Sequence, residues 1–271
     1  MIAARAKVNL ALHVRRRRGD GYHDLETLFA FTAFGDALQV VAGEGLTLDV
    51  RGPMAAAIAG EAPADNLVLR AARALAAAAG IERPAAALTL DKHIPVAAGL
   101  GGGSADAAAA LRLLDRFWGL GLGLDALAAI AAPLGADVPA CVYERTAVGT
   151  GRGEALTPVD LGLAGTPVLL VNPGFAVPTG PVFAGWDGVD RGPLDPAAWR
   201  AARNDLTPLA VRLQPVIADV LAALEATGAT FVRMSGSGAT CLALYGTRDA
   251  CAAAQQAVAA RGWWNTATTL V

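Results

Sequence analysis

Cysteine and histidine are scarce in this chain, with three of each among 271 residues. Cys141, Cys241 and Cys251 are odd in number and far apart, and they form no C-x-x-C pair, so neither a disulfide framework nor a zinc site is indicated. The histidines, at positions 13, 23 and 93, show no metal-ligand spacing either. The cysteines are therefore interpreted as small buried apolar residues of a protein from a reducing, cytoplasmic setting.

Net charge and long apolar runs are also nearly absent. The chain has 22 Lys and Arg against 24 Asp and Glu, a net charge of -2, which argues against a nucleic-acid partner because such partners require a basic surface. The hydrophobic fraction of 54% comes largely from alanine. No stretch reaches the roughly 18 uninterrupted apolar residues of a membrane span, and the N-terminal residues lack the order of regions in a signal peptide. We therefore expect a cytoplasmic protein with no membrane partner.

The chain contains enough apolar material for a sizeable core and shows no compositional sign of disorder. Residues 6–14 alternate between apolar and polar, which predicts a half-buried strand. Further strands are predicted at 25–31, 37–41, 46–50, 87–91, 168–171, 230–234 and 241–245, and helices at 66–79, 104–118, 124–134, 208–227 (kinked or split at Pro215) and 249–261. Because strands and helices do not alternate strictly, we expect an α+β fold, with two domains at 1–155 and 156–271.

A glycine-rich loop precedes the predicted helix at 104–118. Its core, Gly99-Leu100-Gly101-Gly102-Gly103, has four glycines in five positions, so the backbone can fold closely around a ligand. Ser104 is placed to cap the helix, whose first N–H groups would then bind an anion, with polyphosphate as the natural candidate. The loop lacks the lysine of G-x-x-x-x-G-K-[ST] and does not match G-x-G-x-x-G. A glycine turn without a ligand stays open as the alternative.

Several other polar residues have both a structural and a functional interpretation. Lys7 and Asn9 project to the same face of a strand, which by default is a solvated face. Asp137 lies in a turn, where an isolated Asp usually serves as a cap. The dipeptide Tyr22-His23 is suited to contact a flat heterocycle or to pack on the edge of the core. The turn Ser235-Gly236-Ser237-Gly238 is either a simple hairpin turn or a nest of N–H groups for a phosphate.

Five segments follow one another in an order that is found in a known family. They are Lys7-Val8-Asn9-Leu10, Gly19-Asp20-Gly21-Tyr22-His23, the loop from Pro95 to Asp106, Gly135-Ala136-Asp137-Val138-Pro139 and Ser235-Gly236-Ser237-Gly238. With these segments the chain resembles the GHMP kinases over nearly its whole length, from about residue 6 to residue 245. The glycine loop is typical of the whole family. The opening at Lys7-Val8-Asn9-Leu10, the Tyr22-His23 turn and the segment Gly135-Ala136-Asp137-Val138-Pro139 are similar to those of members that act on 4-diphosphocytidyl-2-C-methyl-D-erythritol.

The resemblance implies a two-domain α+β GHMP-kinase fold with the active site in the cleft between the domains. It implies that the γ-phosphoryl group of ATP is transferred to the 2-hydroxyl of this cytidylyl substrate, a step of non-mevalonate isoprenoid precursor biosynthesis. Mg²⁺ would accompany ATP, but its protein ligands are not identifiable from the sequence. The implied partners are these small molecules alone.

The resemblance also implies a role for each matching residue. Asp137 would be the catalytic base, with Lys7 as its partner. ATP would be bound by Asn66 at the nucleotide end and by the loop residues Pro95, Val96, Ala97, Ala98, Gly99, Leu100, Gly101, Gly102, Gly103, Ser104 and Ala105. The cytidylyl substrate would be bound by Asn9, Tyr22, His23, Thr179, Phe183, Ser235 and Gly236. Ala105 departs from the family, many members of which have a second serine there.

Two alternatives stay open at this stage. One is another small-molecule GHMP kinase, of the homoserine or mevalonate type; the Tyr22-His23 turn argues against it, because those substrates have no base to stack. The other is a nucleotide-binding regulator that has lost catalysis. The presence of both Lys7 and Asp137 argues against a regulator, since a binding protein needs no proton acceptor.

Overall fold

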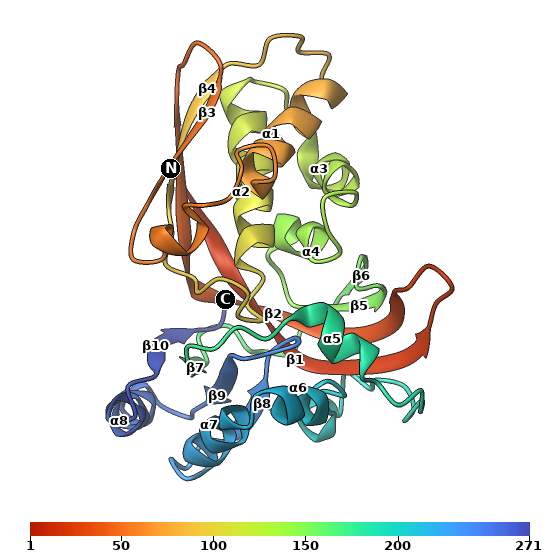
Figure 1. Cartoon of the computed structure of the whole chain (residues 1–271), viewed down its shortest axis with the longest axis vertical. Coiled ribbons are helices and arrows are strands. Elements are labelled where there is room, and N and C mark those ends of the chain that lie inside the picture. Colours follow the sequence, from red (N-terminus) through yellow and green to blue (C-terminus); the bar gives the residue numbers. More distant parts are fainter. The chain divides into compact units, whose positions relative to one another are not determined.

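The computed structural model describes residues 1–271 and has two compact units, to both of which the two longest strands contribute. These strands, β1 (Ile2–Arg17) and β2 (His23–Val41), pair with each other and are drawn in red to orange in Figure 1. The first unit comprises Met1–Lys7, Gly35–Val96 and Gly101–Glu144, and the second comprises Val8–Phe34, Ala97–Leu100 and Arg145–Val271. The single domain boundary near residue 155 stays a prediction, since the compact units are interleaved along the chain.

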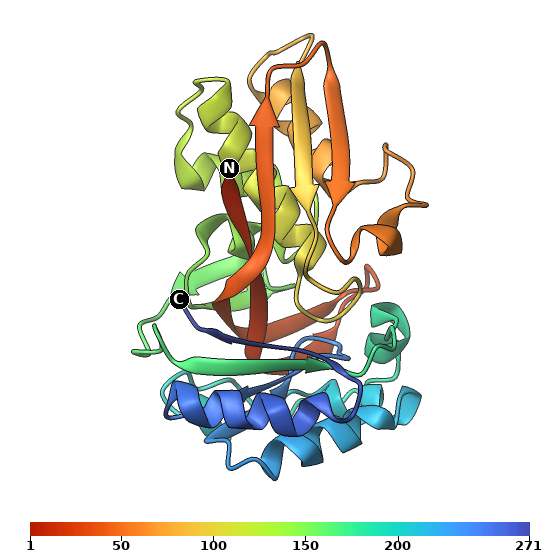
Figure 2. The ribbon, with the colours of Figure 1, turned by 90° about the vertical axis from the view of Figure 1, so that its left-hand side faces the viewer.

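In the first unit, helices cover one face of a small sheet. β3 (Leu46–Arg51) runs parallel to β4 (Ala86–Asp91), and β4 pairs antiparallel with residues 37–41 of β2. Helices α1 (Leu67–Ala78), α2 (Gly102–Phe117) and α3 (Gly123–Ala131) lie behind these strands in Figure 2, and no helix covers the face toward the viewer. The short η1 (Ala55–Ile58) precedes α1, and α4 (Val138–Tyr143) packs on α2 and α3. Because half of the buried residues of α2 are alanines, neighbouring helices can approach it closely.

The second unit contains a four-stranded antiparallel sheet in the order β10-β7-β9-β8. Its strands are β7 (Pro167–Asn172), β8 (Phe231–Met234), β9 (Cys241–Leu244) and β10 (Trp264–Thr269). α7 (Val216–Glu225) packs on β8 and β9, and α8 (Arg248–Ala259) packs on β7 and β10. In the same unit, β2 pairs through residues 25–29 with β5 (Ala147–Gly151), and β5 pairs with β6 (Ala155–Pro158). The remaining elements are α5 (Thr179–Ala184), η2 (Trp199–Ala201) and α6 (Thr207–Leu213).

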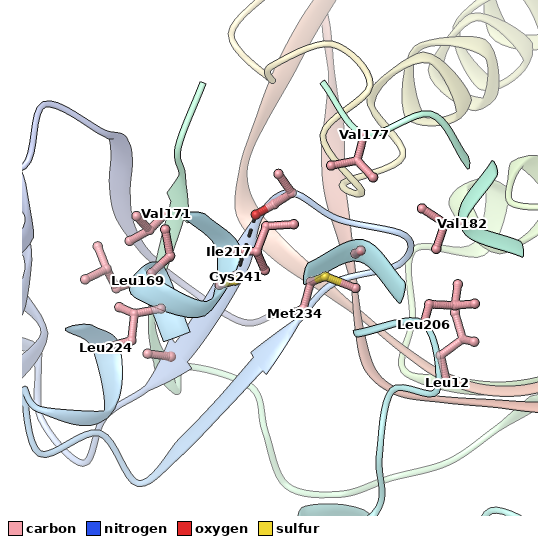
Figure 3. Close-up of a cluster of buried hydrophobic side chains, with 14 of the residues drawn as sticks. Leu12, Leu169, Val171, Val177, Val182, Leu206, Ile217, Leu224, Met234 and Cys241 are labelled. Carbon is pink, nitrogen blue, oxygen red and sulfur yellow. Dashed lines mark hydrogen bonds between the residues drawn. The ribbon is translucent and has the colours of Figure 1, made fainter. Parts of the chain in front are cut away.

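The core of the second unit lies between this sheet and its helices. Figure 3 shows Leu169 and Val171 of β7 close to Ile217 and Leu224 of α7, with Met234 of β8 beside them. All of these side chains are at most 2% exposed. Burying a side chain of this size contributes roughly 1.5–3 kcal/mol, so this cluster is a main source of the unit's stability.

The α+β class predicted from the sequence is confirmed, and several element boundaries are corrected. The predicted helix at 208–227 is split at Pro215, as expected, because proline has no N–H to donate within a helix. The predicted strands at 25–31 and 37–41 are wrong as separate strands, since β2 is continuous. A Cβ on Gly35 would lie 2.3 Å from the carbonyl oxygen of Ala4, so glycine lets β2 pass close to β1 at this point. No helix is long and apolar enough to cross a membrane.

Candidate active site

Lys7 and Asp137 form an ion pair within the first unit. The Nζ atom of Lys7 lies 2.9 Å from Oδ2 of Asp137. The side chain of Lys7 is 5% exposed and that of Asp137 33%, so the ammonium is enclosed while the carboxylate reaches solvent. A buried ammonium is costly unless an anion compensates it, and this pairing therefore holds both groups in place. The solvated-face interpretation of Lys7 is wrong.

The position of Asp137 at the start of α4 bears on whether its carboxylate caps that helix or pairs with Lys7. Asp137 directly precedes α4, and Pro139 lies in the first turn of that helix. The Asp137 side chain makes no capping hydrogen bond to α4, so the capping interpretation is wrong as well. The carboxylate is directed to Lys7 instead of to the N–H groups of its own helix.

The second half of the glycine loop leads into α2 beside Lys7. The N-cap of α2 is Gly101, with φ of 64°, and the helix begins at Gly102, so the prediction that Ser104 is the N-cap is wrong. A Cβ on Gly101 would lie 2.7 Å from Cγ of Lys7, which explains why glycine is required here. The first N–H groups of a helix have no acceptor within it, and the helix dipole adds positive character. Together with Lys7, they form a place suited to a phosphate.

The first half of the loop, Ala97–Leu100, packs against the β8–β9 turn in the second unit. Ser235 Oγ donates to the carbonyl oxygen of Gly99 at 2.8 Å, and Thr240 N donates to that of Ala98 at 3.1 Å. A Cβ on Gly99, whose φ is 77°, would lie 2.3 Å from the carbonyl oxygen of Ser235. The hairpin turn predicted at 235–238 is confirmed, and it supports the glycine loop directly.

Asn9 connects this turn to β1. Its backbone N–H donates to Ser235 Oγ at 3.1 Å, and its side-chain Nδ2 donates to Thr27 Oγ1 at 2.7 Å. Asn9 and Ser235 are both buried, so the solvated-face interpretation is wrong for Asn9 too. Gly236 follows Ser235 and accepts a hydrogen bond from Asn204 Nδ2 at 2.8 Å. These contacts order the turn; that Asn9, Ser235 and Gly236 bind substrate stays a prediction.

His23 lies in an aromatic cluster in the second unit. Its ring is 5.2 Å from that of Phe183 and 5.7 Å from that of Trp186, and the residue is 6% exposed. Burial lowers the pKa of His23 below its usual value, and the positive charge of Arg17 lowers it further. Arg17 Nε donates to His23 Nε2 at 3.4 Å, so the proton of the neutral ring is on Nδ1.

Tyr22, the neighbour of His23, has the opposite exposure. The residue is 54% exposed, and the guanidinium of Arg152 lies 5.0 Å from the ring centroid. The interpretation that Tyr22 packs on the edge of the core is therefore wrong, whereas for His23 it holds. Thr179, at the start of α5, hydrogen-bonds through its Oγ1 to Ser237 Oγ at 3.0 Å. The same short helix carries Phe183.

A pocket of about 290 Å³ lies in the first unit among β3, η1 and α1. It is lined mainly by aliphatic side chains, with Asn66 and Glu61 as polar members: Leu48, Val50, Ala55, Ala56, Ile58, Ala59, Glu61, Pro63, Asn66 and Leu69. Asn66 caps α1 by accepting from Val68 N, and it donates to Glu61 Oε2 at 2.9 Å. An aliphatic pocket with few polar groups is typical of a site for a flat heterocycle. Of these lining residues only Asn66 was predicted from the sequence, because apolar residues of a strand and a helix carry no chemical signature.

The arginine run at 15–18 is not a free cationic patch. Arg15 pairs with Glu26 and Asp190, and both Arg16 and Arg18 pair with Asp24. Arg17 donates to backbone carbonyls in residues 184–186 and to His23. The run therefore holds together the surroundings of the His23 cluster.

Metal-ligating side chains do not gather anywhere in the structure. No group of three or more His, Cys, Asp or Glu residues is close enough to hold a metal ion. The donor set therefore does not build a metal site from the protein alone.

Comparison with known proteins gives concordant matches over both halves of the chain. The description "GHMP kinases N terminal domain" matches residues 66–145, and "GHMP kinases C terminal" matches residues 190–262. A relative from Rhizorhabdus wittichii, named 4-diphosphocytidyl-2-C-methyl-D-erythritol kinase, is 54% identical over 98% of this chain and 93% of its own. A relative of the same name from Novosphingobium aromaticivorans is 51% identical over 97% of this chain and 90% of its own.

Among solved structures, one of 4-(cytidine 5'-diphospho)-2C-methyl-D-erythritol kinase is similar throughout. It matches with a TM-score of 0.84 at 36% sequence identity, and the match covers 99% of this chain and 98% of the other. Sequence and structure comparisons therefore agree.

Proposed function

The chain belongs to the GHMP kinase family, and from this premise we propose that it transfers the γ-phosphoryl group of ATP to the 2-hydroxyl of 4-diphosphocytidyl-2-C-methyl-D-erythritol. The two relatives described above, which are named for this substrate, align with at least 97% of the chain at 51% identity or more. Within the chain itself, the proposal depends most on one observation: the Lys7–Asp137 ion pair lies beside the glycine N-cap of α2.

The first turn of α2 is the proposed phosphate-binding element, and Lys7 lies beside it as a charge that acts on the transferred group. The N–H groups of Gly102, Gly103 and Ser104 are in the first turn, where they have no acceptor within the helix. Lys7 places one positive charge beside Gly101, the residue that precedes this turn. Phosphoryl transfer depends mainly on positioning and on stabilising charge on the transferred group, which is what these donors supply.

Asp137 is the proposed proton acceptor. As the substrate's 2-hydroxyl oxygen forms its bond to the γ-phosphorus, the bond from that phosphorus to the β,γ-bridging oxygen breaks and ADP leaves. The hydroxyl proton passes to the Asp137 carboxylate, which reaches solvent while its ionic partner does not. Lys7 orients this carboxylate and stabilises negative charge near the transferred group.

The cytidylyl substrate is proposed to bind through residues of the second unit. Tyr22 offers an exposed ring on which a pyrimidine can stack, and neutral His23 offers a ring N–H for a hydrogen bond. Asn9, Thr179, Phe183, Ser235 and Gly236 complete the proposed set. Asn9 follows Lys7 by two positions in β1, on the same face of the strand.

ATP is proposed to place its base in the pocket that Asn66 lines, because that pocket is aliphatic and belongs to the same unit as Lys7 and the start of α2. Mg²⁺ is proposed to arrive with ATP, since it commonly keeps water and phosphate oxygens as ligands.

The test is an ADP-release assay of the purified chain with ATP, Mg²⁺ and one of three acceptors. We expect turnover with the cytidylyl methylerythritol and none with mevalonate or homoserine. Phosphorus NMR of the product should show a new phosphomonoester at the 2-position. Turnover with mevalonate or homoserine alone would assign the chain to another branch of the family. ATP binding without turnover on any acceptor would favour the regulator.

A further inference from the structure

A second buried lysine, which the proposed reaction does not use, lies near the glycine loop. Lys92 immediately follows β4 and is buried. Its Nζ lies 2.5 Å from Oδ2 of Asp36 and 2.7 Å from Oδ2 of Asp106. Both carboxylates are also buried, so this is an enclosed group of one cation and two acids. We call these three residues the Lys92 clasp.

Asp36 fixes the backbone that enters the glycine loop. Its Oδ1 accepts the backbone N–H of His93 at 2.5 Å and that of Ile94 at 2.8 Å, while its Oδ2 accepts from Lys92. Asp36 is part of β2, so these bonds tie the residues just before Pro95 to a strand of the sheet. The start of the loop thereby acquires a fixed position within the first unit.

Lys92 and Asp106 extend this connection to the other end of the loop. Asp106 lies in α2, a little more than one turn after Gly102. A Cβ built on Gly102 would lie 3.0 Å from Lys92 Nζ and 3.0 Å from Cγ2 of Ile94, so the ammonium lies against the first residue of the helix. The clasp therefore holds the end of β4 and the beginning of α2 at a set separation.

The charges of the three clasp side chains bear on the free-energy cost of burying them together. Burial raises the pKa of Asp106 to about 8; Lys92 opposes this rise and Asp36 adds to it. The raised pKa favours the protonated form of Asp106, which lessens the excess of negative charge around the Lys92 ammonium. Oδ1 of Asp106 is buried and has no hydrogen-bond partner in the structure. Burying such a group costs free energy, so the clasp is weak evidence for added stability.

We propose that Lys92 is a positioning residue for nucleotide binding, which sets the separation of the two ends of the glycine loop and thereby the aim of the N–H groups of α2. This rests on the proposed function, because the loop is taken to bind the phosphates of ATP. Lys92 acts on affinity for ATP and leaves the site of the cytidylyl substrate unaffected. Asp36 and Asp106 hold its ammonium in place.

The test compares ATP affinity among purified full-length variants by calorimetry, together with KM for each substrate. Lys92→Met should weaken ATP binding about 10-fold, with KM for the cytidylyl substrate changed less than 2-fold. Asp106→Asn keeps an oxygen for Lys92 to donate to, so its ATP affinity should stay within 2-fold of wild type. Asp106→Leu removes that oxygen and should weaken ATP binding as Lys92→Met does.

A matched control is available in the same helix. Arg112 of α2 is also a buried cation, and it donates to Glu144 Oε1 at 2.8 Å and to the carbonyl oxygen of Cys141 at 2.8 Å. Arg112→Met should lower the melting temperature but leave ATP affinity unchanged. Hydrogen exchange gives a readout without ATP: the amides of residues 101–104 should exchange faster in Lys92→Met and not in Arg112→Met.

The outcomes separate this proposal from the proposed function. If folded Lys92→Met binds ATP like wild type, or if KM for both substrates rises equally, the positioning role is overturned while the kinase activity can still stand. If Lys92→Met does not fold, Asp106→Leu with unchanged ATP affinity overturns it. If wild type binds ATP and does not phosphorylate the cytidylyl substrate, the proposed function fails, and weaker ATP binding by Lys92→Met still supports the clasp.

Discussion

The Nζ of Lys7 lies 2.9 Å from the Oδ2 of Asp137, and of the two side chains only the carboxylate is open to solvent. We therefore expect Asp137→Ala to lower kcat by roughly 10²-fold or more, the usual scale for a general base, in a protein that remains folded by circular dichroism. Asp125→Ala is the matched control, because Asp125 is an exposed carboxylate that accepts from the hydroxyl of Tyr143 in α4. Near wild-type turnover in folded Asp137→Ala would rule out the assigned role.

Removing the cation of this pair should lower kcat without lowering the affinity for ATP. Lys7→Ala should lower kcat by about 10²-fold, since it withdraws a charge aimed at the transferred group. ATP affinity should be largely kept, because the N–H groups of the α2 turn carry the phosphates. Calorimetry with ATP and a kcat measurement on the same preparation test this. A collapse of ATP affinity would make Lys7 a phosphate ligand instead.

Gly101 offers a test of the space that Lys7 occupies. Gly101→Ala would place a methyl group 2.7 Å from Cγ of Lys7 and should displace that side chain. Gly121→Ala is the control, because Gly121 has φ of 63° against 64° for Gly101 and nothing within 4 Å of a built Cβ. Both variants should lose about 1–2 kcal/mol of stability from the left-handed backbone. Only Gly101→Ala should lose turnover, and equal kcat values for the two variants would contradict this account.

The exposed ring of Tyr22 should matter to one substrate only. Tyr22→Ala should raise KM for the cytidylyl substrate about 10-fold, the scale of one base stacked on one aromatic ring, with KM for ATP unchanged. Tyr22→Phe keeps the ring and should behave like wild type. An unchanged KM in Tyr22→Ala would mean that no base stacks at this position.

The raised pKa of Asp106 predicts how stability depends on pH. Between the ordinary Asp value of 3.8 and the folded value of about 8, the folded chain holds a proton that the unfolded chain has released. Stability from this group is therefore complete below pH 3.8 and is lost as pH rises toward 8. Asp106→Asn should gain stability relative to wild type from pH 5 to pH 8 in urea titrations. A constant difference across that range would show that Asp106 ionises normally.

Functional residues were predicted best from the sequence where their types and local motifs are recognisable. The segments with Lys7 and Asp137 were identified by their order along the chain, and the structure brings the two side chains together. Pro215 correctly predicted a helix break, since its effect is local. Helix capping at Ser104 was predicted wrongly, because the shape of the loop is decided by the contact between Gly101 and Lys7.

Other features depend on long-range contacts that no local pattern reveals. The clasp unites Asp36, Lys92 and Asp106 from a strand, a strand end and a helix, and no local pattern indicates that these three side chains meet. The strands β5 and β6 and the pocket beside Asn66 were missed for the same reason. Continuity of β2 through Gly35 follows from its neighbour strand and not from its own residues.

The interleaving of the two units has a consequence for how the chain folds as it is made. Val8–Phe34 is translated before most of the first unit, yet most of the unit to which it belongs, Arg145–Val271, is translated after it. More than a hundred residues separate these strand residues in the sequence from the segment with which they form their core. Such distant pairings make folding slow and leave strand edges open to aggregation meanwhile. The second unit therefore cannot be completed until residues far downstream of its first strands have been made.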